Sequence, residues 1–527
     1  NLLDIARIKI LCKETGVFKV SQKLSNLVFS FDTEDLAKYL SVKDSGELKE
    51  CVKKLNGTWA FVWIDSTDDF ICLAVDHIRS IQLLYKKDTE SSVLSIFDDI
   101  ANFTKENPQS FDESCLHEYL SSGYVYYNRT LYKDVFSLQA AEFVTFDKTG
   151  KPVSERYWRY IPNINKKITD SKENLLKKID DVFCDSMKRL RESVGDRRIV
   201  VPLSGGYDSR LIVNYLYKAG IKKVLCYTYG IPGNGESICS KEVASRLGYE
   251  WHFIETTPEK EQALRFDESF KDYYLYMANG TNRPCFQEYS ALKSLKDQGI
   301  VSTEDIVVPG YYFDYLAGSH VESRIYRWNV CTETYIWENN FFPRHAVKKT
   351  LNAIKRGFDE QSDLTHYQFC EGWSWQERLA KFIVNNVRCF EYLGFEWRLP
   401  VCDFELFKLW LSIPYKMRHE RRYFKEIFPS LVVEELKDAP FHCIKGNAKT
   451  VLGALIGKYT PAFWRFLLRE LPNRKGYNNQ PQVTQMIDTI SKSFSPEISS
   501  RLLGNRWRPL TGNKLMPLFV LYHLMSK

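Results

Sequence analysis

Short apolar and aromatic runs alternate with turn signals over roughly the first 165 residues of the chain. The stretch 55–85 reads LNGTWAFVWIDSTDDFICLAVDHIRSIQLLY, with turn signals at Asn56-Gly57 and Asp65-Ser66. A similar alternation returns at 142–157, with a turn at 148–150. Short strands separated by such turns are typical of antiparallel sheets. The pattern therefore predicts a β-rich, antiparallel N-terminal domain with some helices.

The pattern changes after a linker candidate at 162–165, where a helix over 170–194 with Ser171 near its start is expected. Apolar strands and helices then alternate along the chain, which predicts an α/β domain with a parallel, doubly wound sheet. The expected elements are strands at 198–203, 224–229 and 251–254 and helices at 211–219 and around 242–247. Helical patterns dominate from about residue 350, including 404–411 and 430–436.

Composition and charge exclude several classes of protein. The 527 residues are 44% hydrophobic and 26% charged, which excludes a disordered or collagen-like chain. The excess of 73 basic over 66 acidic residues gives a net charge of only +7, spread along the chain, so we expect no nucleic-acid partner. No apolar run of about 18 residues occurs, so no transmembrane segment is expected. Thirteen cysteines at irregular spacings, without CxxC, suggest reduced thiols and a cytoplasmic protein rather than a zinc site.

The sharpest motif is SGGYDSR at 204–210, between a predicted strand and a predicted helix. Paired glycines let the backbone approach a phosphate, and the helix N-terminus offers free N–H groups. Asp208 would repel a phosphate unless a cation such as Mg²⁺ lies between them. The loop lacks the GKS/T ending of a Walker A motif, so transfer of a γ-phosphate is not indicated. The alternative is a strand-to-helix turn that merely requires glycine.

SGGYDSR resembles the pyrophosphate loop of asparagine synthetase-like enzymes, which cleave ATP between the α and β phosphates. Two further segments match in the same order: PGYYFDYLAGS at 309–319 resembles the second acidic loop, and EYLGFEWRLPVCD at 391–403 resembles the E-x-R-x-P-x-x-D segment. The segments LNGTWAFVWIDS and AVDHIRSIQLLY are similar to the glutamine-hydrolysing domain of the same enzymes. The resemblance covers nearly the whole chain, although the last 80 or so residues match only loosely.

The resemblance implies two domains. Residues 1–168 would form an Ntn-hydrolase-like antiparallel β sandwich with helices, and residues 169–527 a doubly wound PP-loop synthetase domain with extra helices. A glutaminase of this type needs cysteine as its first residue, but Asn1 stands there and Cys12 is internal. The glutamine-binding "NGE" stretch also has no counterpart in LVFSFDTEDL at 27–36. We expect a degenerate class II glutaminase that serves as a platform; a trimmed terminus is the alternative.

The resemblance also implies the reaction and its ligands. The enzyme would use ATP and Mg²⁺ to adenylate a small-molecule carboxylate, release pyrophosphate and AMP, and form an amide with ammonia or an amine. Mg²⁺ would be held by Asp208 and Asp314. The nucleotide would be bound by the phosphate loop and by backbone groups at the strand ends, at Leu203, Ser204, Gly205, Gly206, Asp208, Ser209, Tyr229, Gly230 and Gly310.

Three residues are candidates for catalysis. Family members that close β-lactam rings have a tyrosine at the position of Tyr311, paired with a glutamate that matches Glu396, and such a pair can remove a proton from an attacking amine. The alternative is a buried hydrogen bond without chemistry. Lys445, in HCIKGN, matches a lysine over the developing oxyanion charge, with Lys425 as a competitor.

The phrases PGxxxDxLAGSH and FEWRLPxxD resemble family members from bacterial surface-polysaccharide clusters. That resemblance implies amidation of a sugar carboxylate. Two alternatives stay open: an intramolecular lactam or macrolactam cyclase, and a nucleotide-binding pseudoenzyme, because Tyr207, Tyr312 and Phe313 are bulky for their loops. A homodimer is one possible assembly.

Overall fold

The structure is a computed structural model that describes most of the chain between residues 49 and 441. The described residues are 2–5, 8–12, 49–50, 52–65, 70–87, 94–146, 150–164, 170–256, 270–284, 287–320, 336, 352, 354–357, 360–361, 363–441, 521 and 524.

The N-terminal part contains two β-sheets. The six-stranded sheet has the order β1 (Leu2–Ile5), β2 (Ile8–Cys12), β3 (Ala60–Asp65), β4 (Phe70–Val75), β8 (Glu142–Phe146), β9 (Pro152–Arg156). Its neighbours are antiparallel except β2 and β3, which are parallel. The second sheet has the order β6 (Leu94–Phe97), β5 (Leu84–Lys87), β7 (Val135–Ser137).

Alternating side chains place both faces of the larger sheet in a core. On β4, Ile71, Leu73 and Val75 enter the core between the two sheets, whereas Cys72 and Ala74 face the larger core of the molecule. This follows from the period of two along a strand. The expected β sandwich with helices is therefore confirmed, its helices including α3 (Ile100–Glu106) and α4 (Glu113–Ser122).

The second part is built on a parallel sheet. Its order is β12 (Glu250–Glu255), β11 (Val224–Gly230), β10 (Ile199–Pro202), β13 (Ile306–Val307), β14 (Glu396–Trp397). Every neighbouring pair is parallel. The helices α6 (Tyr207–Lys218) and α7 (Gly235–Arg246) connect the first three strands in sequence, and α5 (Lys172–Val194) precedes them. The doubly wound sheet is thus confirmed, and its strand order reverses between β10 and β13, where α/β proteins bind ligands.

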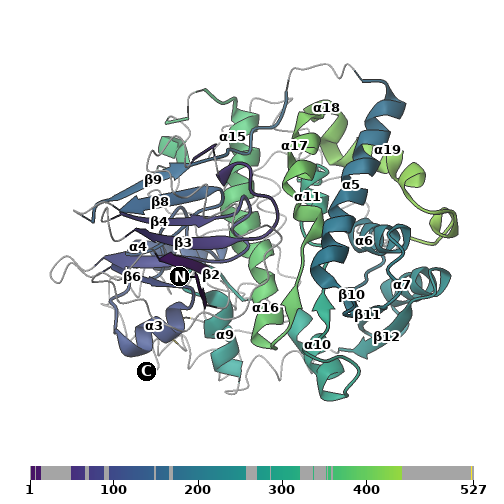
Figure 1. Cartoon of the computed structure of the whole chain (residues 1–527), viewed down its shortest axis with the longest axis horizontal. Helices are drawn as coiled ribbons and strands as arrows, with labels where there is room; N and C mark the ends of the chain where they lie inside the picture. The colour runs from purple at the N-terminus through teal and green to yellow at the C-terminus, as the bar shows by residue number, and fades with distance from the viewer. Residues whose placement is uncertain are drawn as a thin grey trace, which may run out of the picture.

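Further helices lie between β12 and β14 and after β14. The main elements are α9 (Lys271–Ala278), α10 (Gln287–Asp297), α11 (Phe313–Leu316), α15 (His366–Trp373), the π-helix η2 (Ser374–Ile383), α16 (Val387–Tyr392), α17 (Phe404–Ser412), α18 (Tyr415–Arg418) and α19 (Arg422–Leu431). In Figure 1 the helices α16, α17 and α5 lie between the N-terminal strands and the parallel sheet.

The expected helix over 430–436 is wrong. Helix α19 ends at Leu431, and a short 3₁₀ turn covers Glu434–Leu436. The cause is a side chain from α6: Asn214 donates to the Leu431 carbonyl at 3.1 Å and accepts from the Val433 N–H at 2.8 Å. This clamp satisfies the end of the helix and turns the chain, and it depends on a residue more than 200 positions away.

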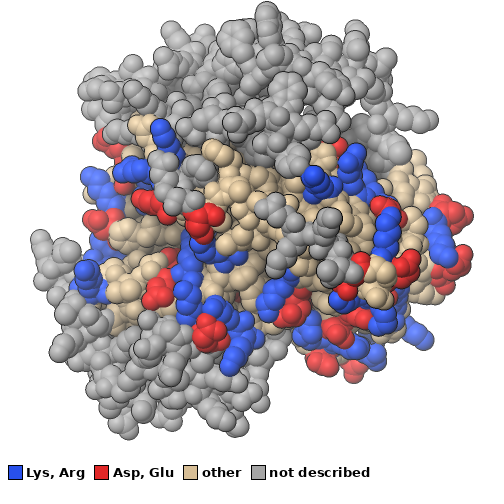
Figure 2. All heavy atoms as spheres, turned by 90° about the horizontal axis from the view of Figure 1, so that it is seen from above, with Lys and Arg blue, Asp and Glu red and all other residues tan. Residues whose placement is uncertain are grey.

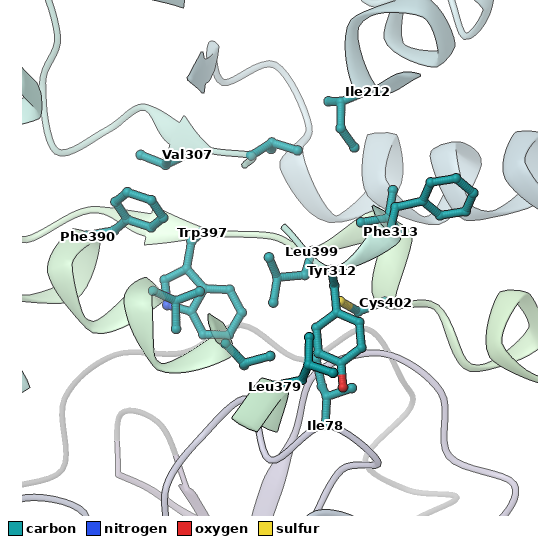
Figure 3. Close-up of a cluster of buried hydrophobic side chains, with 14 of the residues drawn as sticks. Ile78, Ile212, Val307, Tyr312, Phe313, Leu379, Phe390, Trp397, Leu399 and Cys402 are labelled. Atoms are coloured by element: carbon teal, nitrogen blue, oxygen red, sulfur yellow. The ribbon is translucent and has the colours of Figure 1, made fainter. Parts of the chain in front are cut away.

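The two parts share one hydrophobic core. Ile78 from the N-terminal part lies in the same cluster as Tyr312, Leu379 and Cys402 (Figure 3). The surface in Figure 2 shows basic and acidic side chains interspersed rather than gathered by sign. Among the described residues, no helix is long and apolar enough to cross a membrane.

Candidate nucleotide-binding and catalytic site

The loop between β10 and α6 is organised by two serine hydroxyls. Ser209 Oγ accepts from the Ser204 N–H at 2.9 Å, and the two hydroxyl oxygens lie 3.0 Å apart. Ser204 Oγ in turn accepts from the Gly206 N–H at 3.2 Å. Gly206 is the N-cap of α6 and supplies no side-chain cap. The first turn of α6 therefore presents backbone N–H groups without a capping side chain, as an anion site requires.

Gly310 brings the second loop against the first. A Cβ atom on Gly310 would lie 2.7 Å from the Ser209 nitrogen and 2.9 Å from the Asp208 carbonyl carbon. Only glycine permits this approach, because both neighbours are backbone atoms. The loop that follows β13 and the loop that follows β10 are thus in direct contact, at the carboxyl edge of the sheet.

The bulky residues of these loops pack against other side chains. Tyr312 has φ of 90° at the N-cap of α11, yet its side chain and that of Phe313 are buried in the core (Figure 3). Tyr207 packs against Phe428 and Phe441, with ring centroids 4.9 and 4.6 Å away. Tyr312 and Phe313 therefore contribute to the core, and Tyr207 packs on aromatic rings that follow it in the chain.

The two expected metal ligands lie near each other. Burial and the negative charge of Asp314 raise the pKa of Asp208 to about 8. Asp314 Oδ2 accepts from Ser319 Oγ at 3.0 Å and lies 3.7 Å from His320 Nε2. Burial and the charge of Arg378 lower the pKa of His320 to about 4, so this histidine is neutral near pH 7.

The carboxylate pair suits a divalent cation. Asp208 Oδ1 is buried and has no hydrogen-bond partner among the described residues. A bound cation would satisfy that oxygen and remove the repulsion between the carboxylates. No group of three or more His, Cys, Asp or Glu forms a metal cluster in the described parts of the chain. Phosphate oxygens and water would have to complete the coordination, as is common for Mg²⁺.

Glu396 lies at the wrong end of the sheet to pair with Tyr311. It is in register with Ile306 and accepts from Arg197 at 2.7 Å and Arg398 at 3.1 Å. Burial raises its pKa, but the two arginines outweigh this and hold the pKa below its usual value. The expected Tyr311–Glu396 pair is therefore wrong, because the strand carries Glu396 to the amino edge of the sheet.

Glu288, in the first turn of α10, takes the place expected for Glu396. Its carboxylate accepts from Tyr227 at 2.9 Å and from Tyr229 at 3.2 Å. Burial raises the pKa of Glu288, and the hydroxyl groups of Tyr227, Tyr229 and Tyr311 partly offset that effect. Tyr311 also stacks on Phe390, with ring centroids 6.2 Å apart. The sequence offered no signal for Glu288, which looks like any polar residue of an amphipathic helix.

The residues expected to border the adenine lie at the ends of strands. Leu203 donates its N–H to the Tyr227 carbonyl at 2.8 Å and accepts from Thr228 Oγ1 at 2.6 Å, so β11 already engages its backbone. Gly230 has φ of 137° and ends β11. Together with Gly310 these residues border the carboxyl edge of the sheet, and their contacts with adenine stay a prediction.

The structure describes only one of the two lysine candidates. Lys425 is exposed on α19, whereas Lys445 lies outside the described residues. The described segment that leads toward Lys445 is anchored beside the loop: Arg210 donates to the Ala439 carbonyl at 3.0 Å and its guanidinium lies 3.8 Å from the Phe441 ring centroid.

The structure describes only some of the residues on which the glutaminase prediction depends. Asn1 and the stretch 27–36 lie outside the described residues, and Cys12 ends β2 inside the larger sheet, where it is in register with Ile64. The domain boundary at 168/169 also stays a prediction.

Comparisons with known proteins agree with this architecture. A family model described as a glutamine amidotransferase domain matches residues 21–158, and one described as asparagine synthase matches residues 178–300. The fold and these matches define a glutamine amidotransferase-like domain followed by a domain of ATP-dependent, amide-forming ligases. The chain is an asparagine synthetase-like protein. No curated protein matches it.

Solved structures give remote similarities. An NH3-dependent NAD synthetase from Campylobacter jejuni subsp. jejuni NCTC 11168 is 16% identical, with a TM-score of 0.22 and coverage of 38% of this chain and 91% of that one. An NMN synthetase from Francisella tularensis is 15% identical, with a TM-score of 0.18 and coverage of 48% and 96%. A glutamine-dependent NAD+ synthetase from Acinetobacter baumannii is 10% identical, with a TM-score of 0.21 and coverage of 57% and 67%.

Proposed function

We propose that this protein is a carbon–nitrogen ligase that adenylates a small carboxylate with ATP and transfers the acyl group to ammonia or an amine. One observation carries the proposal: Asp208 and Asp314 lie near each other beside the N-terminus of α6, which has no capping side chain. Two adjacent carboxylates are unfavourable at an anion site unless a cation bridges them to phosphate. A magnesium–pyrophosphate product fits that arrangement better than a structural turn does.

In the first step an oxygen of the substrate carboxylate forms a bond to the α-phosphorus of ATP, and the bond between that phosphorus and the bridging oxygen to the β-phosphorus breaks. Pyrophosphate leaves with the electron pair. Ser204, Ser209 and the N–H groups of the loop would hold it, and Asp208 and Asp314 would hold Mg²⁺, which neutralises phosphate charge when bound. Leu203, Tyr229, Gly230 and Gly310 would border the adenine.

In the second step the nitrogen forms a bond to the acyl carbon, the bond from that carbon to the AMP oxygen breaks, and AMP leaves. The attacking nitrogen must lose a proton. We assign that proton to the Tyr311 oxygen, with the phenol proton passing to Glu288. The raised pKa of Glu288 brings a carboxylate closer to the range in which it acts as a base near neutral pH.

We further propose that Lys445 stabilises the oxyanion of this step. Its support is the anchoring of Phe441, four positions earlier, against Arg210 and Tyr207 at the start of α6. The nitrogen would come from ammonia or an amine rather than glutamine, since 27–36 lacks the NGE stretch. A cytoplasmic location and a homodimer belong to the same proposal.

The proposed substrate is a sugar carboxylate, after the resemblance of 309–320 and 395–403 to proteins of surface-polysaccharide clusters. A second candidate is closure of a lactam, which Tyr311 favours because ring-closing family members carry tyrosine there.

The test is product analysis with ATP and Mg²⁺ against panels of uronic acids and amino acids, with ammonia, with glutamine and with neither. We expect pyrophosphate and AMP, support by ammonia, and none by glutamine. Asp314→Asn should abolish turnover, whereas Asp297→Asn, an exposed carboxylate on α10, should not. Release of ADP and phosphate would reject adenylation, and ATP binding without release of any product would favour the nucleotide-binding pseudoenzyme.

A further inference from the structure

A strained corner lies between α18 and α19. Glu420 has φ of 50° and Arg421 has φ of 60°, so two consecutive residues with large side chains adopt the left-handed conformation. This conformation is disfavoured for residues other than glycine, and it persists only where the surrounding structure enforces it. The contacts of the corner with the rest of the protein must therefore hold residues 420 and 421 in this conformation.

The corner is fixed to the acidic loop. The buried guanidinium of Arg418 donates to Glu371 at 2.7 and 3.0 Å, which holds the end of α18 in the core. The Arg418 carbonyl oxygen lies against Gly318, at a place where any Cβ would collide with it. Gly318 belongs to the same loop as Asp314. The position of residues 419–421 is thus set relative to the candidate site.

Arg421 leaves this corner toward the first turn of α6. Its guanidinium carbon lies 5.6 Å from the ring centroid of Tyr207, the residue next to Asp208 and Gly206. It makes no hydrogen bond or ion pair with any residue in the parts of the chain that the structure describes, although it is half-buried. Arg421 lies near enough to both loops for its charge to act on Asp208 and His320.

Charge at the site favours a ligand for this guanidinium. The phosphate loop offers neutral N–H and hydroxyl donors, and the carboxylates of Asp208 and Asp314 lie beside them. Arg210, also on α6, is turned away and donates to the carbonyls of Ala439 and Pro440. A triphosphate therefore needs a cation besides Mg²⁺, and a guanidinium matches phosphate oxygens with two parallel donors.

We infer that Arg421 binds the pyrophosphoryl end of the nucleotide, and that the left-handed corner exists to aim it there. The inference rests on the proposed function, because it takes the first turn of α6 as the phosphate site. It adds a residue that no motif in the segment MRHERRYF indicates. The backbone strain is then retained because relaxing it would withdraw the guanidinium from the leaving pyrophosphate.

The test compares Arg421→Asn and Arg421→Lys with Arg422→Asn in the full chain. Asparagine tolerates the left-handed conformation, lysine keeps the charge, and Arg422 is the exposed neighbour. Binding of inorganic pyrophosphate and of adenosine is measured by calorimetry with Mg²⁺ present. We expect Arg421→Asn to weaken pyrophosphate at least about tenfold and to leave adenosine unchanged, with partial recovery in Arg421→Lys. Arg422→Asn should bind both like the wild type.

Thermal unfolding separates this role from a structural one. If Arg421 serves binding, Arg421→Asn keeps or raises the melting temperature because strain is relieved; a structural residue would lower it. Unchanged pyrophosphate binding in Arg421→Asn, or an equal loss in Arg422→Asn, would overturn the inference. A wild type that binds pyrophosphate but never releases it from ATP would reject the proposed function alone. A wild type that binds neither probe would reject both.

Discussion

Tyr311 and Glu288 are the residues whose pairing most affects the chemistry. We expect Tyr311→Phe and Glu288→Gln to keep adenylation, measured as ATP–pyrophosphate exchange, and to slow amide formation by at least about 100-fold, because the proton acceptor is lost. Glu396→Gln is the control: it removes two ion pairs to arginine and should lower stability without slowing amide formation. Equal rates in Glu288→Gln and wild type would remove Glu288 from the proton path.

Residues fixed by local chemistry were predictable, and residues fixed by strand register were not. The serines, Gly206 and Asp208 follow one another in a loop whose geometry is set by its own hydrogen bonds, so the motif alone locates them. Asp314 follows from a second motif. The position of Glu396 could not be predicted from its motif. The motif is recognisable, but the position depends on pairing with Ile306 at the amino edge of the sheet. Arg421 and Glu288 have no motif at all.

At the scale of elements, helix ends depend on distant partners. The helix over 404–411 was predictable from its own apolar spacing, and Asp403 caps it by accepting from the Glu405 N–H at 3.0 Å. The end of α19 was not, since Asn214 from α6 terminates it. Likewise α15 and α18 are joined by the buried Glu371–Arg418 pair, which no local pattern announces.

Glu371 holds α18, and with it the corner that carries Arg421. Its carboxylate also accepts from Tyr160 at 3.0 Å. We expect Glu371→Gln to lower the free energy of unfolding by about 3–5 kcal/mol, because Arg418 would remain buried without its counter-charge. Asp363→Asn, which breaks an exposed pair with Arg159, should leave the free energy of unfolding nearly unchanged. Denaturant unfolding measures both, and similar small losses would show that Arg418 finds other partners.

At the scale of the whole molecule, the N-terminal domain is built into the ligase domain. Asn56 donates to Asp403 at 3.1 Å and accepts from the Phe404 N–H at 2.8 Å. The sequence led us to expect a platform, but its contacts join positions nearly 350 residues apart and could not be inferred from spacing. The domain therefore has a structural role whether or not it hydrolyses glutamine.

His77 makes this interface sensitive to acid. Its ring packs on Phe404 and Phe407, each with ring centroids 4.7 Å away, and burial lowers its pKa from 6.5 to about 3. Between pH 6.5 and about 3, His77 is therefore protonated in the unfolded chain but neutral in the folded chain. The stability present above pH 6.5 is then lost as the pH falls toward 3, by up to about 5 kcal/mol from this group.

Replacing His77 tests this linkage between the domains. His77→Phe keeps an aromatic ring among aromatic neighbours and cannot be protonated, so its free energy of unfolding should fall less between pH 7 and pH 3 than that of the wild type. The exposed His366→Gln should follow the wild type. Denaturant titrations at several pH values measure the difference. Parallel curves for His77→Phe and wild type would mean that the interface opens and hydrates His77 before the rest of the molecule unfolds.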